Sequence, residues 1–262
     1  MTVLDELAEE ASRRVSEAEK EVPPDEMRRR SSAAAAGPKQ FPFEEALRKE
    51  GMSFICEVKK ASPSKGVISE AYPYLDIAKE YEAAGASCIS VLTEPSRFLG
   101  DLGHLSEIAS AVRIPVLRKD FVVDEYMVHE AKCAGASAVL LICSILSKEE
   151  LRRLIEVCDS LSMSALVEAH DPSEVSMALE CGARIIGVNN RDLKDFTVDH
   201  LNCLRLRPMV PENVLFVAES GIKSRRDVED LERNGVDAVL IGETLMRSDD
   251  RAAKIRELRG LP

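Results

Sequence analysis

The sequence lacks several features that identify common classes of protein. Its 262 residues contain no Cys-x-x-Cys pair, and its four histidines show no paired helical spacing, so a structural zinc site is not expected. The longest apolar stretch, around residues 136–146, is too short to span a membrane. Basic residues are outnumbered 35 to 46, and this acidic balance argues against a general binder of nucleic acids or anionic membranes.

The rest of the composition is typical of a folded domain. Hydrophobic residues make up 45% of the chain and charged residues 31%, and the length suffices for a sizeable core. Most of the seven cysteines lie in apolar stretches, as free buried thiols do in a reducing compartment. The acidic start, MTVLDELAEE, lacks the basic region of a signal peptide. We therefore expect a cytoplasmic protein.

Residues 1–50 differ from the remainder and are predicted to form a helical extension. An amphipathic helix is indicated by apolar residues at spacings of three and four, namely Leu4, Leu7, Ala11, Val15 and Ala18. Pro23 and Pro24 end it. The charged and alanine-rich stretch that follows, up to Gly37-Pro38, is predicted to be a turn or mobile link. A second short helix is predicted over residues 43–49.

Residues 51–262 alternate short apolar runs with helical stretches. Eight runs are predicted strands, at 54–59, 87–92, 115–120, 137–142, 164–169, 184–189, 215–220 and 237–242. Glycines at 85, 135, 182 and 235 precede every second run, where they would cap the preceding helix. This repeat predicts an α/β fold, a closed (β/α)8 TIM barrel. The alternative, an open doubly wound sheet, would be expected to carry a Gly-rich nucleotide turn after its first strand, and none is present.

Charged side chains stand near the carboxyl ends of the odd-numbered strands, where barrel enzymes place their active sites. The first strand ends with Glu57 and Lys59, which face the same side because they are two residues apart. The third ends with Lys119 and the fifth with Glu168. Alternate strands supply one interior layer, so Glu57 or Lys59 is expected to lie in a ring with Lys119 and Glu168.

The seventh strand adds Glu219 or Ser220 to this ring, and the sixth adds Asn189. Each residue alone is equally consistent with an ordinary ion pair at a strand end, but burying a whole charged ring without a function is costly. Arg118 and Asp120 alternate with Lys119 along their strand. They are therefore expected to face outward, into salt bridges between strand and helix.

Two further segments indicate a polar, anionic ligand. The loop after the first strand contains Ser62, Pro63 and Ser64, and is either a shaped ligand loop or a plain surface turn. The last two strands are followed by Gly221 and by Gly242-Glu243, where backbone amides can approach an anion. This is the usual phosphate position in such barrels. We expect the amide of Glu243 to serve and its carboxylate to point away.

Taken in order, several segments resemble the motif series of the indole-3-glycerol phosphate synthase family. They are ICEVKKASPSKG, SVLTE, PVLRKDF, ALVEAH, IIGVNNRDL, AESGI and LIGETLMR. The resemblance covers the chain from about residue 52 to its end. It implies a carboxy-lyase of tryptophan biosynthesis that acts on 1-(2-carboxyphenylamino)-1-deoxyribulose 5-phosphate by ring closure, decarboxylation and dehydration, without a cofactor or metal.

The resemblance also implies roles for individual residues. Lys119 would be the general acid and Glu168 the general base, while Lys59, kept in place by Glu57, would hold the substrate carboxylate. Partial burial of these lysines is expected to lower their pKa toward usable values. Supporting or orienting contacts would come from Ser62, Asn189, Arg191, Glu219 and Ser220. The aromatic end would lie against Pro63, Phe98, Phe121 and Leu140, and the phosphate at Gly221, Gly242 and Glu243.

The implied partner is a small phosphorylated substrate, with no nucleic acid and no membrane. The resemblance suggests a monomer, open to weak association with other tryptophan-pathway enzymes, and it places the first helix over the barrel mouth. Two rival functions fit the same residues. One is an aldolase-like barrel in which Lys119 forms a Schiff base, and the other is a non-catalytic phosphate-binding barrel.

Overall fold

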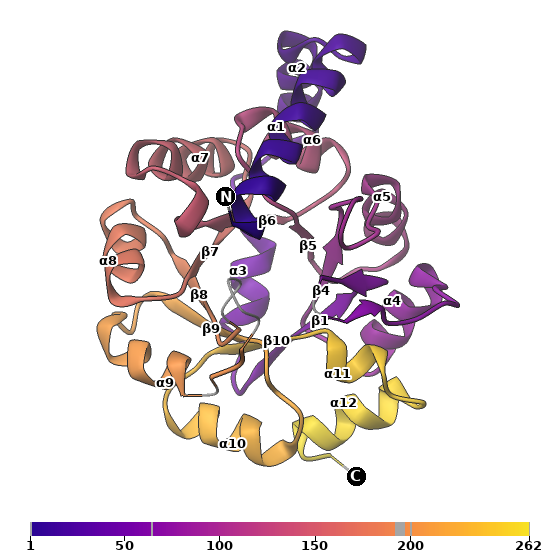
Figure 1. Cartoon of the computed structure of the whole chain (residues 1–262), viewed down its shortest axis with the longest axis vertical. Coiled ribbons are helices and arrows are strands. Elements are labelled where there is room, and N and C mark those ends of the chain that lie inside the picture. The colour runs from indigo at the N-terminus through magenta and orange to yellow at the C-terminus, as the bar shows by residue number, and fades with distance from the viewer. Residues whose placement is uncertain (1, 64, 192–196, 200, 262) are drawn as a thin grey trace.

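The chain folds around a closed barrel of eight parallel strands (Figure 1). The computed structural model describes residues 2–63, 65–191, 197–199 and 201–261. The barrel strands follow one another in chain order and close between the last and the first: β1 Ser53–Val58, β4 Cys88–Leu92, β5 Val116–Lys119, β6 Ala138–Ile142, β7 Ser164–Ala169, β8 Ile185–Asn189, β9 Leu215–Glu219 and β10 Ala238–Ile241. Each lies within or overlaps one predicted run, so the predicted TIM barrel is confirmed.

Helices cover the outside of the barrel, which explains why the strands are apolar on both faces (Figure 1). They are α4 Tyr74–Ala83, α5 Leu102–Ala111, α6 Glu125–Cys133, α7 Lys148–Ser160, α8 Pro172–Glu180, α9 Asn202–Leu206, α10 Arg225–Arg233, α11 Glu243–Met246 and α12 Arg251–Arg259. Short 3-10 turns lie at Cys143–Ile145 and Arg207–Met209. The side chains of Asp124 and Asp171 cap α6 and α8 by accepting backbone N–H groups.

Glycine ends two of the outer helices as the sequence repeat predicts. Gly85 follows α4 with a φ of +92°, and Gly135 follows α6 with a φ of +90°. This left-handed conformation lets the chain reverse from a helix into the next strand without a steric penalty at Cβ. The glycine repeat therefore marks the tight turns by which the chain passes from a helix into every second strand.

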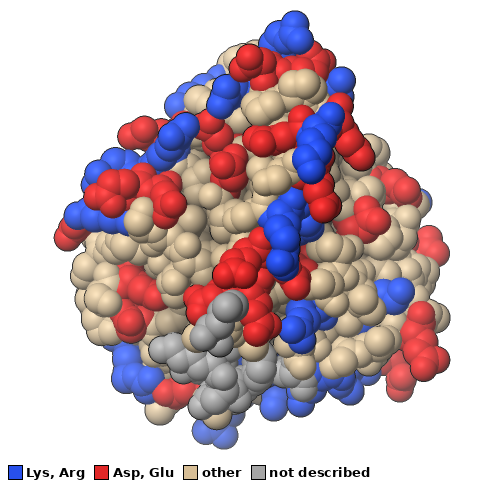
Figure 2. Space-filling model, turned by 45° about the horizontal axis from the view of Figure 1, so that its top comes forward, with Lys and Arg blue, Asp and Glu red and all other residues tan. Residues whose placement is uncertain are grey.

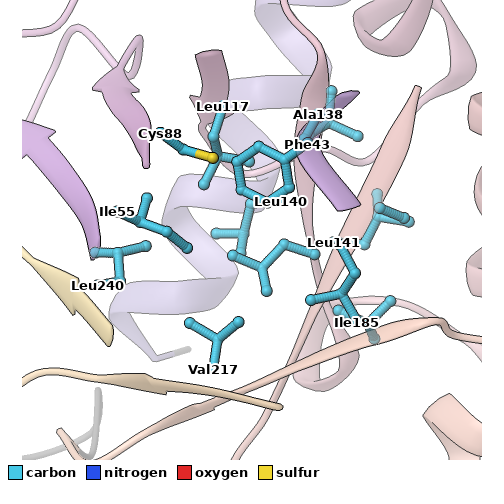
Figure 3. Packing of buried hydrophobic residues seen from close by; sticks show 14 of the residues in the cluster. Phe43, Ile55, Cys88, Leu117, Ala138, Leu140, Leu141, Ile185, Val217 and Leu240 are labelled. Carbon is cyan, nitrogen blue, oxygen red and sulfur yellow. The ribbon is translucent and has the colours of Figure 1, made fainter. Parts of the chain in front are cut away.

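Aliphatic side chains from successive strands fill the barrel interior (Figure 3). Ile55, Leu117, Leu140 and Val217 belong to one buried cluster, and Phe43 from the N-terminal extension joins it. Phe43 lies on α3 (Pro42–Leu47), whose Glu44 accepts a hydrogen bond from the Ser164 hydroxyl at the start of β7. Helix α3 therefore closes the amino-terminal end of the barrel and leaves the carboxyl end for the site.

The extension contains one helix more than the sequence analysis predicts. Helix α1 (Val3–Glu21) matches the predicted amphipathic helix, and α3 matches the predicted second one. The intervening stretch, predicted as a turn or link, forms helix α2 over Pro24–Ala34, so that prediction is wrong. Figure 1 shows α1 and α2 as neighbours at one side of the barrel, next to α6.

Helix α2 forms with few apolar residues because charges and one packed face stabilise it. Met27 and Ser31 are its buried residues, and the Ser31 hydroxyl lies 2.8 Å from His129 Nδ1 on α6. Arg28 donates to Glu125 of α6, and Arg30 donates to Glu26 one turn earlier. Figure 2 shows the resulting interleaved acidic and basic side chains over the extension. Within the described residues, no helix is long and apolar enough to cross a membrane.

Candidate active site

A cavity of about 510 Å³ opens at the carboxyl ends of the barrel strands. Every residue singled out from the sequence as catalytic, substrate-binding or phosphate-binding lines it, except that Ser64 lies outside the described residues, as do Asp192 and Leu193 of the NNRDL motif. Val3, Leu4 and Leu7 of α1 line the cavity too, which confirms that the first helix covers the barrel mouth. The alternation of side chains along each strand therefore does bring the predicted polar ring together.

Lys119 stands at the centre of this ring. Its Nζ lies 3.3 Å from Glu168 Oε2 and 3.3 Å from Glu219 Oε2, so one ammonium group faces two carboxyl groups. Glu168 and Glu219 are each only 1% exposed, and the Lys119 side chain is 13% exposed. Lys119 ends β5, Glu168 is the last residue but one of β7, and Glu219 ends β9. These are alternate strands of the barrel, which supply the side chains of one interior layer.

The surroundings of this cluster shift the pKa values of its three groups in different directions. Burial disfavours the Lys119 ammonium, but Glu219 and Glu168 outweigh it and raise the pKa of Lys119 above its ordinary value. The expectation that burial lowers this pKa is therefore wrong, because two acids act on one amine. Burial also disfavours the charged carboxylates, yet Lys119 and His170 hold the pKa of Glu168 well below its usual range. Burial and the neighbouring Glu168 charge raise the pKa of Glu219.

Glu57 and Lys59 form a second ion pair on β1, next to this cluster. Lys59 Nζ lies 2.5 Å from Glu57 Oε1, and both side chains are largely buried. A side chain at Gly242 would collide with this pair, since a Cβ there would lie 2.2 Å from Glu57 Oε1 and 3.0 Å from Lys59 Nζ. The backbone at Gly242, in the turn after β10, therefore lies so close to the side chains of β1 that a glycine is needed there.

Asn189, Ser220 and Arg191 complete the polar wall of the cavity. Asn189 helps to lower the pKa of Glu168, and its side-chain oxygen accepts the backbone N–H of Arg191 at 3.0 Å. Ser220 adopts a φ of +66°, which is rare outside glycine, and its carbonyl oxygen accepts the Asn190 side-chain amide at 3.1 Å. The turn after β9 is therefore held in an unusual conformation at the place predicted for the phosphate.

The carboxylate of Glu243 does not point away, as the sequence analysis expected. Its Oε2 lies 3.3 Å from Arg191 Nη2, and its Oε1 lies 3.3 Å from Arg247 Nε and 3.9 Å from Lys65 Nζ. All four side chains line the cavity. The carboxylate lies here because three cations from the loops after β1 and β8 and from the end of α11 surround it.

The opposite part of the cavity is apolar. Phe98 and Phe121 lie with ring centroids 6.1 Å apart, and Pro63 and Leu140 line the same space. The loop that carries Phe98 is held by Glu94, a residue 1% exposed, which accepts the backbone N–H groups of Ser96, Arg97 and Phe98. The cavity thus combines a charged side with an apolar side on a fixed loop.

Arg118 and Asp120 make contacts between strand and helix, as predicted, although Asp120 also lines the cavity. Arg118 donates to Glu130 of α6 at 2.7 Å. Asp120 accepts Arg14 of α1 through both oxygens, at 2.7 and 3.0 Å, and accepts the Thr93 hydroxyl at 2.6 Å. The helix that covers the cavity is therefore fastened to the residue that follows Lys119.

Sequence reasoning missed three residues that shape the site. Arg14 and Glu94 act through contacts between distant segments, which no local pattern reveals. His170 lies 3.3 Å from Glu168, and a signal for it was present, because residues two apart in a strand face the same side.

The chain matches one protein family over nearly its whole length. The family model described as indole-3-glycerol phosphate synthase matches residues 4–258. An indole-3-glycerol phosphate synthase of Ruminiclostridium cellulolyticum is 51% identical over 258 residues, which cover 98% of this chain and 99% of that protein. One of Endomicrobium trichonymphae is 54% identical over 217 residues, covering 83% and 84%.

Solved structures resemble the chain in fold. A 3-hexulose-6-phosphate synthase matches with a TM-score of 0.65 at 16% identity, over 80% of this chain and 99% of that one. The tryptophan synthase complex of Pyrococcus furiosus matches with a TM-score of 0.59 at 13% identity, over 80% and 98%. At these identities the likeness supports the barrel and carries no statement about the reaction.

Proposed function

Because the chain belongs to the indole-3-glycerol phosphate synthase family, we propose that its cavity closes the indole ring by lysine–glutamate acid–base catalysis. The protein is a carboxy-lyase of tryptophan biosynthesis. Its substrate is 1-(2-carboxyphenylamino)-1-deoxyribulose 5-phosphate, and its products are indole-3-glycerol phosphate, carbon dioxide and water. The observation that carries the acid–base proposal is the Lys119 ammonium, which lies 3.3 Å from each of two buried carboxyl groups in one cavity.

Lys119 supplies the proton for ring closure. The ring carbon that bears the carboxylate attacks the ketone carbon, a carbon–carbon bond forms, and the ketone oxygen gains negative charge. Lys119 stabilises this oxygen and protonates it to a hydroxyl group. A raised amine pKa is no obstacle, because an alkoxide is a much stronger base than an amine.

Lys59 binds the substrate carboxylate until it leaves. The bond between the ring carbon and the carboxylate breaks, carbon dioxide departs, and the electron pair restores the aromatic ring. Glu57 lies 2.5 Å from Lys59 Nζ and keeps this ammonium at the edge of the cavity. Ser62, on the short strand β2 (Ala61–Ser62) that pairs with β3 (Gly66–Val67), lines the same wall and provides a hydroxyl contact.

Glu168 removes a proton in the final dehydration. The hydroxyl group leaves as water after a second protonation, and Glu168 takes the proton from the neighbouring carbon that is bonded to nitrogen. Two protons are delivered and one is recovered, so each turnover takes up one proton from solution. The 3.3 Å separation between Glu168 and Lys119 gives the recovered proton a direct way back to the acid.

The remaining residues bind the two ends of the substrate. The backbone amides near Gly221 and at Gly242-Glu243, together with Lys65 and Arg191, suit the phosphate. Asn189, Ser220 and Glu219 orient the hydroxyl groups and the acid–base pair. The aromatic ring packs against the apolar side of the cavity, which is formed by Pro63, Phe98, Phe121 and Leu140.

We place this reaction in the cytoplasm and expect a monomer, with at most weak association with other enzymes of the pathway. Six of the seven cysteines are buried, as suits a protein of a reducing compartment. Size-exclusion chromatography with light scattering tests the monomer, and a stable dimer would contradict it.

The direct test is incubation with the carboxyphenylamino-deoxyribulose phosphate, followed by the fluorescence of the indole product. Turnover supports the proposal, whereas binding without turnover indicates a non-catalytic phosphate-binding barrel. Borohydride reduction in the presence of substrate distinguishes the aldolase-like alternative. A covalent adduct on Lys119 would contradict its role as a general acid.

A further inference from the structure

The two carboxyl groups beside Lys119 are not equivalent, and a histidine makes the difference. Glu168 and Glu219 lie at the same distance from Lys119 Nζ, so Lys119 alone does not decide which of them is ionised. We propose that His170 is a positioning residue that makes Glu168, rather than Glu219, the ionised partner of Lys119 and hence the base. This inference rests on the proposed function, because it concerns the residue that accepts the substrate proton.

His170 lies against the oxygen of Glu168 that Lys119 does not contact. Its Nε2 is 3.3 Å from Glu168 Oε1, while Lys119 Nζ is 3.3 Å from Oε2. Oε1 and Nε2 are both buried, and neither has an aligned hydrogen-bond partner within the described part of the chain. Their contact is therefore an ion pair, and without His170 this oxygen would lose the positive charge that lies 3.3 Å away.

Glu174 holds His170 in this position from the opposite side. Glu174 Oε2 lies 3.2 Å from His170 Nδ1 and accepts the backbone N–H of His170 at 2.7 Å. Glu174 is in the first turn of α8, where Asp171 caps the helix and accepts the Glu174 N–H at 3.0 Å. A row of three side chains, Glu168–His170–Glu174, thus runs from the cavity wall to the start of α8.

His170 carries positive charge at neutral pH because two carboxylates surround it. Burial disfavours the imidazolium, but Glu168 and Glu174 outweigh burial and raise the pKa of His170 to about 10. Glu219, in contrast, forms an ion pair with Lys119 and with no other cation of the described residues, and its Oε1 is buried there without a hydrogen-bond partner. The negative charge of the pair is therefore more stable on Glu168.

Other groups around this row do not remove the asymmetry. The charged, titratable or hydrogen-bonding side chains around Glu168, His170 and their neighbours Lys119 and Glu219 include Cys143 after β6, Asp171 before α8 and Asn189 on β8, and Glu57 on β1 acts on Lys119 and Glu219. Besides His170, Lys119 is the one cation in this set, and its Nζ lies 3.3 Å from each of the two carboxyl groups.

The test is the pH dependence of kcat in His170→Asn. An opposite charge within 4–6 Å shifts a carboxyl pKa by about 1–3 units. Loss of the imidazolium should therefore raise the pKa of Glu168 and move the acid limb of the kcat–pH profile, the fall of kcat at low pH, upward by about one pH unit or more. At the pH where wild-type kcat has fallen to half on its acid side, we expect kcat of the variant to be at least about fivefold lower than that of the wild type. KM should stay within about threefold of the wild type, and kcat should be largely restored about two pH units higher. Glu174→Gln should move the limb in the same direction by less.

Two controls separate this role from a structural one. His104→Gln removes a histidine that stacks on Tyr74, outside the cavity, and should leave the acid limb in place. In the Glu219→Gln background the imidazolium still acts directly on Glu168, so the same His170 substitution should move the acid limb by a similar amount; an unmoved limb there would assign the limb to Glu219 and overturn the inference. A lower thermal midpoint with an unmoved acid limb in His170→Asn would overturn the inference. If His170→Asn does not fold, an unmoved limb in Glu174→Gln would overturn it as well. A wild type without turnover would instead refute the proposed function itself.

Discussion

Replacing Arg14 by methionine removes the ion pair that fastens α1 over the cavity. Arg14 donates to both oxygens of Asp120, at 2.7 and 3.0 Å, and Asp120 follows Lys119 in the chain. The Arg14 side chain is 26% exposed, whereas that of Asp120 is fully buried. Methionine keeps the length and apolar stem of the side chain, so the substitution tests the charge more than the packing.

The size of the effect follows from the environment of Asp120. Burial disfavours its carboxylate, but Arg14, Arg118 and Thr93 outweigh burial and lower its pKa from 3.8 to about 2. This lowering is what the partners provide beyond the cost of burial, and it corresponds to roughly 2–3 kcal/mol. Breaking a buried pair typically costs about 3–5 kcal/mol, but Asp120 keeps Arg118 and Thr93. We therefore expect Arg14→Met to lower the free energy of unfolding by about 2 kcal/mol.

The pH dependence of this loss has a definite sign. The pKa of Asp120 is lower in the folded state, so its stabilisation is present above about pH 4 and is lost as the pH falls toward 2. The difference between wild type and Arg14→Met should accordingly shrink over that range. Urea unfolding followed by circular dichroism measures it, since the chain contains no tryptophan for fluorescence.

Arg13→Met is the matched control, because Arg13 is 68% exposed and lies 3.8 Å from Glu10 on the same helix. It should change the free energy of unfolding by less than about 0.5 kcal/mol. Arg14→Met should also raise KM several-fold, because α1 supplies Leu4 and Leu7 to the cavity. Equal stability of the two variants, or a loss that stays constant down to pH 2, would refute this reasoning.

Three further predictions concern the cavity wall. Gly242→Ala should lower kcat at least about tenfold, because its Cβ would lie 2.2 Å from Glu57 Oε1; unchanged steady-state kinetics would contradict this. Glu243→Gln should tighten the binding of inorganic phosphate several-fold, measured as competitive inhibition, because an anion beside Arg191 is removed; weaker binding would show that the carboxylate positions the cations instead. Glu94→Gln should raise KM several-fold more than it lowers kcat, because the loop bearing the aromatic wall loses charge-assisted hydrogen bonds; an unchanged KM would count against it.

The barrel could be predicted from the sequence because its signals are local and repeated. Apolar runs of strand length, each followed by a helix, leave few alternatives, and glycines such as Gly85 and Gly135 mark every second return. The polar ring followed from the alternation of side chains at strand ends, as Glu57 and Lys59 show. Helix α2 was missed because its stability comes from contacts with α6, which the sequence around Met27 does not display.

The charge state of the site was the least predictable feature. Burial of Lys119 was expected to lower its pKa, but the structure sets two carboxyl groups beside one ammonium, and their combined attraction wins. The orientation of the Glu243 side chain was missed for a similar reason. Its carboxylate meets cations such as Lys65 and Arg191, which come from loops 178 and 52 positions away in the chain.

The central claim is that Lys119 and Glu168 act as acid and base in the cavity they share. The most direct measurement is the single-turnover rate of indole formation from the carboxyphenylamino-deoxyribulose phosphate in Lys119→Met and Glu168→Gln. We predict a fall of about 10²–10⁴-fold in each variant, with inorganic phosphate binding and the circular dichroism spectrum unchanged. A rate within a few-fold of the wild type in either variant would contradict the account.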